Sequence, residues 1–210
     1  MDRAIEQVLA EYDARAEKER SAFSAPAQNM MATRDQLLLR VGPAAGQLIN
    51  ILAKGNGAKS ILELGTSYGY STVWLAEAAR ENGGRVTSLD LVADKQVFAK
   101  GMLGKCGLAD YAQFISGDAV DILKRLDGPF DFVLVDLWKD LYVACFDLLY
   151  PKRLAPGALL VADNMLQPVG AREDANAYRR RVRGSKDMES VLLSVGQGLE
   201  ISRYAPDEKL

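Results

Sequence analysis

The stretch SILELGTSYGYS, residues 60–71, joins a short apolar run to a glycine-containing loop and to the first turn of a helical pattern. We predict a strand over 60–64, a tight loop over 65–69 and a helix over 70–80. Ligands of open α/β sheets bind beyond the carboxyl ends of such strands. The stretch therefore predicts an α/β fold with a ligand site at its first strand-to-helix turn.

The same alternation continues along the chain. Further short apolar runs lie at 85–90, 111–115, 130–135 and 158–162, and helical segments lie near 70–82, 94–105, 118–126 and 140–150. A series of this kind predicts a mostly parallel sheet with helices on both faces. Near the end of the chain, 187–194 and 199–205 have strand patterns joined by a glycine-containing turn, which predicts a C-terminal antiparallel hairpin.

The N-terminal part differs from this alternation. Residues 2–20 and 43–54 have helical spacing, and the stretch SAFSAPAQN between them breaks the pattern. The length suits one well-buried domain. We therefore expect a single domain over 1–210, with N-terminal helices and a substrate-side loop in 1–54 and a cofactor-binding α/β core in 55–210.

Composition narrows the possible functions. The 210 residues are 49% hydrophobic and 26% charged, as in an ordinary globular protein. The first twenty residues are heavily charged, and no apolar run approaches the roughly 18 residues that a membrane span needs, so we expect no membrane partner and a cytoplasmic location. A formal net charge of −2 makes nucleic acid an unexpected partner. The chain has no histidine, so acid-base or metal chemistry must use carboxylates, amides or lysine.

The loop that follows the first strand favours a nucleoside cofactor without a pyrophosphate. Glu63 ends that strand and can accept from an ammonium group or orient the loop, while Asp90 ends the next strand and can accept from ribose hydroxyls. A dinucleotide enzyme would also use Asp90, but its GxGxxG pattern needs glycine at the position of Ser67. Asp118, after the third strand, can accept from an adenine amino group or simply cap the next helix. An ordinary strand-to-helix turn is the alternative for the whole loop.

Oxygen-bearing side chains follow the fourth and fifth strands. Asp136 ends one, and Asp163 and Asn164 end the other. Since adjacent parallel strands end at one edge, these groups should converge and offer hard ligands for Mg²⁺ or Ca²⁺. Each residue taken singly is more often a helix cap or turn former. Lys139 lies three residues beyond Asp136, on the first turn of the next predicted helix, and either faces the same cleft or is solvated.

Three segments carry a family resemblance: ELGTSYGYST, FDFVLVDLWKDLY and LLVADN, all within 41–165. Here the chain resembles the metal-dependent O-methyltransferases, the group of the catechol and caffeoyl-coenzyme A O-methyltransferases and their bacterial relatives. The resemblance implies a Rossmann-like methyltransferase fold, S-adenosyl-L-methionine as cofactor and a divalent cation, with Mg²⁺ the expected one. It also implies a vicinal diphenol as the methyl acceptor. Leu137 stands where the catechol type has histidine, so the resemblance leaves the individual diphenol open.

Position by position, the resemblance also implies roles for individual residues. Asp136, Asp163 and Asn164 would hold the metal, and Lys139 would take the proton of the substrate hydroxyl. Trp138 would flank the adenine. The positions implied to contact the cofactor are Val41, Glu63, Gly65, Ser71, Asp90, Leu91, Asp118, Ala119, Asp136 and Trp138. Those implied to contact substrate are Lys139, Asn164 and, as the nearest acidic residue late in the chain, Glu189.

Other functions remain open at this point. The basic run RRRVR at 179–183 fits a solvated helical face, a clamp for an anionic substrate such as a coenzyme A ester, or a contact to RNA. The rival functions are therefore a tRNA-modifying methyltransferase of the same fold, a non-catalytic cofactor-binding subunit and a nicotinamide-dependent dehydrogenase. A homodimer is a further expectation, because the first helix has an apolar face to bury.

Overall fold

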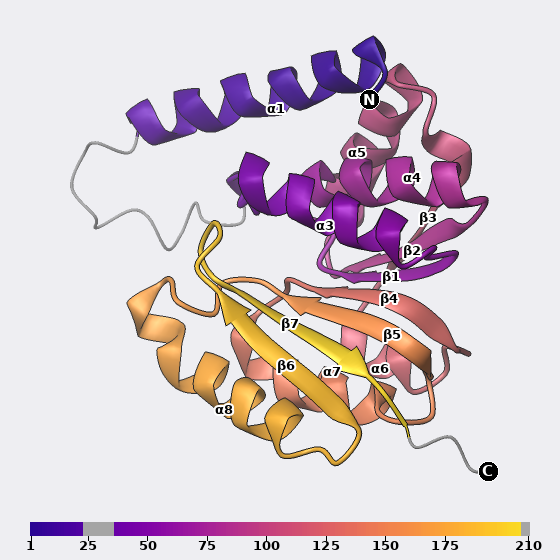
Figure 1. Ribbon diagram of the computed structural model, residues 1–210. Coiled ribbons are helices and arrows are strands. Elements are labelled where there is room, and N and C mark those ends of the chain that lie inside the picture. The colour runs from indigo at the N-terminus through magenta and orange to yellow at the C-terminus, as the bar shows by residue number, and fades with distance from the viewer. Residues whose placement is uncertain (23–35, 207–210) are drawn as a thin grey trace.

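The computed structural model describes residues 1–22 and 36–206, and its centre is one seven-stranded sheet (Figure 1). The strand order is β3-β2-β1-β4-β5-β7-β6. The first five of these strands pair in parallel, whereas β7 runs antiparallel to both β5 and β6. The strands are β1 (Ser60–Leu64), β2 (Arg85–Asp90), β3 (Ala112–Ser116), β4 (Phe130–Val135), β5 (Leu154–Ala162), β6 (Met188–Leu193) and β7 (Leu199–Tyr204). The predicted parallel sheet and C-terminal hairpin are confirmed.

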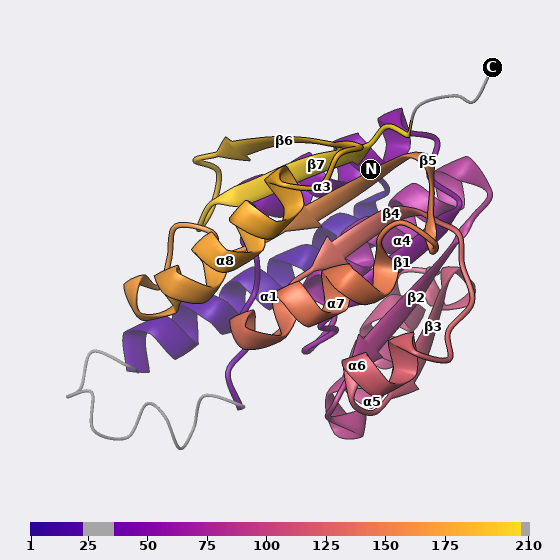
Figure 2. The same ribbon diagram turned by 90° about the horizontal axis from the view of Figure 1, so that it is seen from below.

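Helices cover both faces of the sheet, and each face has its own apolar core. On one face lie α1 (Arg3–Ala22), α3 (Pro43–Gly55), α4 (Tyr70–Asn82) and α5 (Ala93–Lys105). On the other lie α6 (Ala119–Leu123), α7 (Tyr142–Leu149) and α8 (Arg172–Arg183), which Figure 2 shows from below. The central strands β1 and β4 are buried on both sides, which is why their sequences are apolar apart from Ser60, Glu63 and Asp131.

The carboxyl ends of the parallel strands meet at one edge, and Gly65 shows how closely. The amide of Gly65 donates to the carbonyl of Leu89 at 2.9 Å, and the amide of Asp136 donates to the carbonyl of Leu64 at 2.8 Å. Gly65 has a φ of +103°, and a Cβ at this position would lie 2.2 Å from the backbone oxygen of Asp136. Only glycine therefore lets the loop after β1 lie against the residue that ends β4.

Several elements differ from the sequence-based expectation. Helix α8 lies in a stretch where only a basic helical face was foreseen, and β5 begins four residues earlier than the predicted strand at 158–162. Lys139 begins a short 3-10 helix, η4 (Lys139–Leu141), so it precedes α7 and is not on the first α-helical turn. Two further 3-10 helices are η3 (Ala109–Tyr111) and η5 (Val169–Ala171). Most of the expected substrate-side loop lies outside the described residues.

Across residues 1–22 and 36–206, no helix combines the length and the apolar character needed to cross a bilayer.

Candidate functional site

Glu63, in β1, has a buried side chain that contacts the first turn of α4. Its side chain is fully buried and accepts hydrogen bonds from the hydroxyls of Ser71, Thr72 and Ser88. Burial raises the pKa of Glu63 from 4.5 to about 7, although the three hydroxyl donors oppose that shift. Through these hydrogen bonds Glu63 ties the end of β1 to the first turn of α4 and to β2.

Asp90 contacts the loop over 65–69 through a backbone amide. Its Oδ2 accepts from the backbone amide of Ser67 at 2.7 Å, and its Oδ1 accepts from the amide of Val92 at 2.9 Å. Ser67 has a φ of +46°, an uncommon conformation for a residue with a side chain. A carboxylate has about four acceptor positions, so Asp90 keeps lone pairs for further donors such as ribose hydroxyls.

The other residues expected to contact the cofactor have the following positions in the fold. Asp118 is exposed, and its Oδ1 accepts from the amide of Asp121 at 3.0 Å, so it caps α6 as the alternative interpretation held. Ala119 is the first residue of that helix. Leu91 and Trp138 are exposed apolar side chains after β2 and β4, with 70% and 42% of their surface accessible. Val41 is buried just before α3.

The polar groups that end β4 and β5 converge, as the topology predicts. The side chain of Asp136 is 14% exposed, and its Oδ1 lies 3.8 Å from Nζ of Lys139. Nζ in turn donates to Oδ1 of Asn164 at 2.8 Å. Asp163 is buried, and its Oδ1 has no hydrogen-bond partner among the described residues. The structure therefore brings Asp136, Lys139, Asp163 and Asn164 together in one largely buried cluster.

The electrostatics of this cluster fit a cation. Burial raises the pKa of Asp163 to about 6, and burial together with the charge of Asp163 raises the pKa of Asp136 well above its ordinary value. An unsatisfied carboxylate oxygen in such a setting is costly without a counter-charge. No three His, Cys, Asp or Glu side chains meet anywhere in the described part of the chain, so the two carboxylates need the oxygen of Asn164 as a third ligand. This oxygen set suits Mg²⁺, whose remaining positions are usually filled by water or substrate.

Lys139 is not a solvated lysine, because only 10% of its side chain is exposed. Nζ donates to three acceptors: the carbonyl of Leu137 at 3.2 Å, the hydroxyl of Tyr142 at 2.6 Å and Oδ1 of Asn164 at 2.8 Å. Three donated hydrogens correspond to the ammonium form. The lysine therefore supplies a positive charge beside the two buried aspartates.

Two residues of this cluster were not foreseen, and one expected residue is absent from it. Tyr142 contacts Lys139, and Oε1 of Gln197 accepts from Nδ2 of Asn164 at 2.7 Å. Glu189 instead pairs with Arg203, its side chain 73% exposed, and its cross-strand register places it at the far end of β7 from Asn164. Glu189 therefore lies apart from this cluster. Gln197 could have been found from the predicted turn at 196–198, whereas only the DLWKDLY spacing pointed toward Tyr142.

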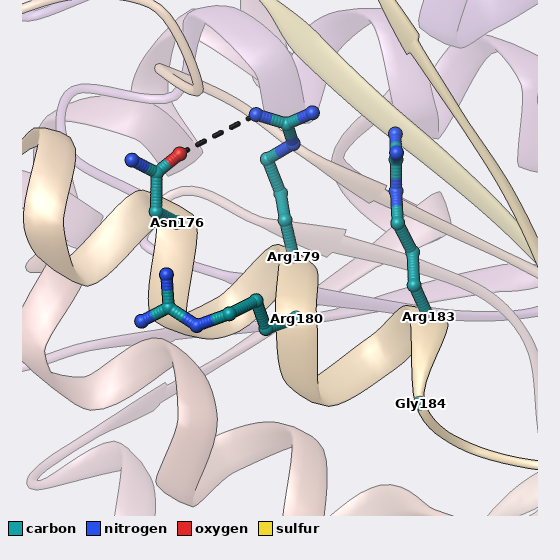
Figure 3. Close-up of a pocket in the computed structure, with 5 residues that line it drawn as sticks. All are labelled: Asn176, Arg179, Arg180, Arg183 and Gly184. Carbon is teal, nitrogen blue, oxygen red and sulfur yellow. Dashed lines mark hydrogen bonds between the residues drawn. The ribbon is translucent and has the colours of Figure 1, made fainter.

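Two arginines of the basic run on α8 contact a buried carboxylate, whereas Arg180 and Arg181 are exposed. Figure 3 shows Arg179 and Arg183 extending from one side of the helix and Arg180 from another, around a shallow pocket with Asn176. Arg183 donates to both oxygens of Glu200, at 2.7 and 3.1 Å, and Nε of Arg179 lies 3.3 Å from that carboxylate. Glu200 is fully buried. Arg179 and Arg183 therefore neutralise a carboxylate inside the protein.

The chain is similar to known O-methyltransferases in sequence and in structure. The model of a family described as O-methyltransferase matches residues 19–204. A catechol O-methyltransferase from Niastella koreensis is 35% identical over 171 residues, which are 79% of this chain and 76% of that protein. Caffeoyl-CoA O-methyltransferase 1 from Eucalyptus globulus is 32% identical and covers 75% of this chain and 72% of its own. The crystal structure of TomG, an O-methyltransferase from Streptomyces achromogenes in complex with SAM, superposes with a TM-score of 0.76 at 26% identity, over 98% and 91% of the two chains.

Proposed function

The chain belongs to the O-methyltransferase family and is an S-adenosylmethionine-dependent O-methyltransferase, and we propose that its acceptor is a small vicinal diphenol that is methylated with the help of Mg²⁺. The proposed metal ligands are Asp136, Asp163 and Asn164, and the proposed base is Lys139. The catechol name of the similar proteins supports this acceptor class.

One observation carries the proposal: Lys139 and the three oxygen ligands share one buried cluster at the edge of the sheet where the loop over 65–69, the proposed cofactor loop, begins. Gly65 of that loop packs against the backbone of Asp136, so the loop and the cluster are in direct contact. A methyl donor on the loop and an acceptor at the cluster would therefore be neighbours. Such proximity is a large part of what an enzyme contributes to a displacement between two bound reactants.

The reaction moves one methyl group and one proton. The acceptor oxygen attacks the methyl carbon of the sulfonium, the carbon–sulfur bond breaks with its electron pair left on sulfur, and the hydroxyl proton passes to Nζ of Lys139. A divalent cation, when bound, supplies Lewis-acid activation of the hydroxyl. Lys139 must enter this step neutral. If Oδ1 of Asn164 bound a cation, it would no longer accept from Nζ, and the side of Nζ that faces the cluster would be free to receive the proton.

A screen of methyl acceptors tests the acceptor class. We expect transfer from S-adenosylmethionine to catechol and to other vicinal diphenols in the presence of Mg²⁺, and at most slight transfer to phenol, which lacks the second oxygen. Bulk tRNA and a caffeoyl thioester of coenzyme A serve as the competing acceptors. Preferred methylation of either of these, or equal rates with phenol and catechol, would overturn the proposal.

A further inference from the structure

Tyr142, the first residue of α7, has its hydroxyl inside the cluster just described although no role has been assigned to it. The side chain is fully buried. Its oxygen accepts a 2.6 Å hydrogen bond from Nζ of Lys139, and its own hydrogen is donated to the backbone carbonyl of Asp163 at 3.3 Å. The hydroxyl thus connects the proposed base to the backbone of a proposed metal ligand.

We propose that Tyr142 is a positioning residue that holds Nζ of Lys139 in the orientation needed to receive the acceptor's proton. The inference rests on the proposed function, because it assumes that Lys139 is the base. A lysine side chain has four rotatable carbon–carbon bonds and by itself fixes its nitrogen poorly. Tyr142 provides a rigid partner, since its ring packs edge to face against Tyr178 with centroids 5.4 Å apart.

The direction of the hydrogen bonds favours this role. The hydroxyl hydrogen of Tyr142 is used by Asp163, so a lone pair of the same oxygen faces Lys139. Nζ also donates to a backbone acceptor, the carbonyl of Leu137, two residues before Lys139. A cation that bound the oxygen of Asn164 would take away the third acceptor. Tyr142 and the carbonyl of Leu137 would then still accept hydrogen bonds from Nζ and hold it at the cluster, beside Asp136.

The neighbouring Tyr178 offers a matched control for a purely structural role. Tyr178 is also fully buried and packs against the ring of Tyr142, but its hydroxyl has no hydrogen-bond partner within the described residues. Tyr142→Phe and Tyr178→Phe each remove one oxygen atom from the same aromatic cluster. Only the first of these changes removes a contact to Lys139.

The kinetic test is a cycle of Tyr142→Phe, Lys139→Ala and the double variant, with Tyr178→Phe as control, assayed with catechol and Mg²⁺. We expect Tyr142→Phe to lower kcat by about tenfold to a hundredfold with little change in KM or in the Kd for S-adenosylmethionine. Because Tyr142 acts through Lys139, the same change in the Lys139→Ala background should cost less than about twofold. Tyr178→Phe should leave kcat within about twofold of wild type.

A second readout needs neither metal nor turnover. A hydrogen-bonded, buried lysine ammonium group exchanges its protons slowly, so Lys139 should give a resolved side-chain ¹⁵N–¹H signal in the metal-free protein. We expect Tyr142→Phe to broaden or remove that signal and Tyr178→Phe to keep it. An unchanged Lys139 signal and an unchanged kcat in Tyr142→Phe would overturn the positioning role. A normal rate in Lys139→Ala would instead overturn the proposed function, so the two failures are distinguishable.

Discussion

Asn164 donates from Nδ2 to Oε1 of Gln197 at 2.7 Å, and this contact turns its Oδ1 toward Lys139 and the aspartates. Asn164 has a φ of +60°, so its backbone is also in a conformation that few residues with side chains adopt. Asparagine is one of the few residues with a side chain that adopts this conformation readily. Gln197 therefore fixes which atom of the Asn164 amide is presented to the cluster.

Loss of Gln197 should weaken the cation site without touching a ligand. Without its partner the Asn164 amide can rotate, and removal of such a supporting contact typically lowers metal affinity by about 10- to 100-fold. We expect this loss for Gln197→Ala when Mg²⁺ or Mn²⁺ binding is measured by titration calorimetry. Gln167→Ala is the control, because Gln167 is exposed nearby and contacts Gln197 only through its backbone amide. Equal affinities in wild type and Gln197→Ala would show that Gln197 does not orient the ligand.

Replacement of Lys139 should separate chemistry from cofactor binding. Lys139→Ala removes the proposed base, and loss of a general base costs roughly 10²- to 10⁴-fold in turnover. The Kd for S-adenosylmethionine should change little, since the hydrogen bonds given for Nζ go to Leu137, Tyr142 and Asn164, and its ion pair goes to Asp136, none of which belongs to the loop over 65–69. Steady-state rates and calorimetry on the same samples check both points. Lys152→Ala, at an exposed lysine, should behave as wild type. A near-normal rate in Lys139→Ala would remove the lysine from the mechanism.

Glu63 should make stability depend on pH in a defined window. Its pKa is raised by burial from 4.5 in the unfolded chain to about 7 in the folded protein, so the folded state binds the extra proton between these values. The contribution of Glu63 is complete below about pH 4.5 and is lost as the pH rises through about 7. We expect the free energy of unfolding of wild type, relative to Glu63→Gln, to fall by about 3 kcal/mol across this window. Urea denaturation of the cofactor-free proteins measures it, and parallel pH profiles would contradict it.

Gly65 should be intolerant of a methyl group for two separable reasons. Alanine at this position must adopt a positive φ, which lowers the free energy of unfolding by about 1–2 kcal/mol. Its Cβ must also displace the backbone of Asp136, so we expect a total loss of about 2–5 kcal/mol. Gly57→Ala is the control, since Gly57 also has a positive φ, of +63°, but has no atom within 4 Å of the added Cβ. Urea denaturation should therefore show a larger loss for Gly65→Ala, together with weaker S-adenosylmethionine binding. Equal losses of unfolding free energy in Gly65→Ala and Gly57→Ala would show that the backbone of Asp136 moves aside at little cost.

Sequence patterns were sufficient for the parallel sheet because buried parallel strands are continuously apolar and their loops carry the polar groups. Topology then brought Asp136 and Asn164 together without any knowledge of side-chain contacts. Helix α8 was harder to predict, since its buried stripe is only Ala175, Tyr178 and Val182 among strongly polar residues. The 3- and 4-residue spacing of that stripe is the signal that could have revealed it.

The detail of the site depended on contacts that periodicity does not encode. The predicted hairpin was right, but its cross-strand register decides that Gln197, and not Glu189, lies beside Asn164. The neutralisation of Glu200 by Arg179 and Arg183 likewise joins two segments whose contact no local pattern indicates. Sequence therefore predicted which edge of the sheet carries the site, whereas the orientation of each side chain came from tertiary packing.

The central claim is that Asp136, Asp163 and Asn164 hold a divalent cation that methyl transfer requires. Its most direct test is the rate of transfer from S-adenosylmethionine to catechol by EDTA-treated protein, before and after Mg²⁺ is returned, with Asp163→Asn measured beside wild type. We predict that EDTA abolishes turnover, that Mg²⁺ restores it in wild type, and that Mg²⁺ fails to restore it in Asp163→Asn while S-adenosylmethionine still binds. Full turnover by wild type in EDTA would contradict the account.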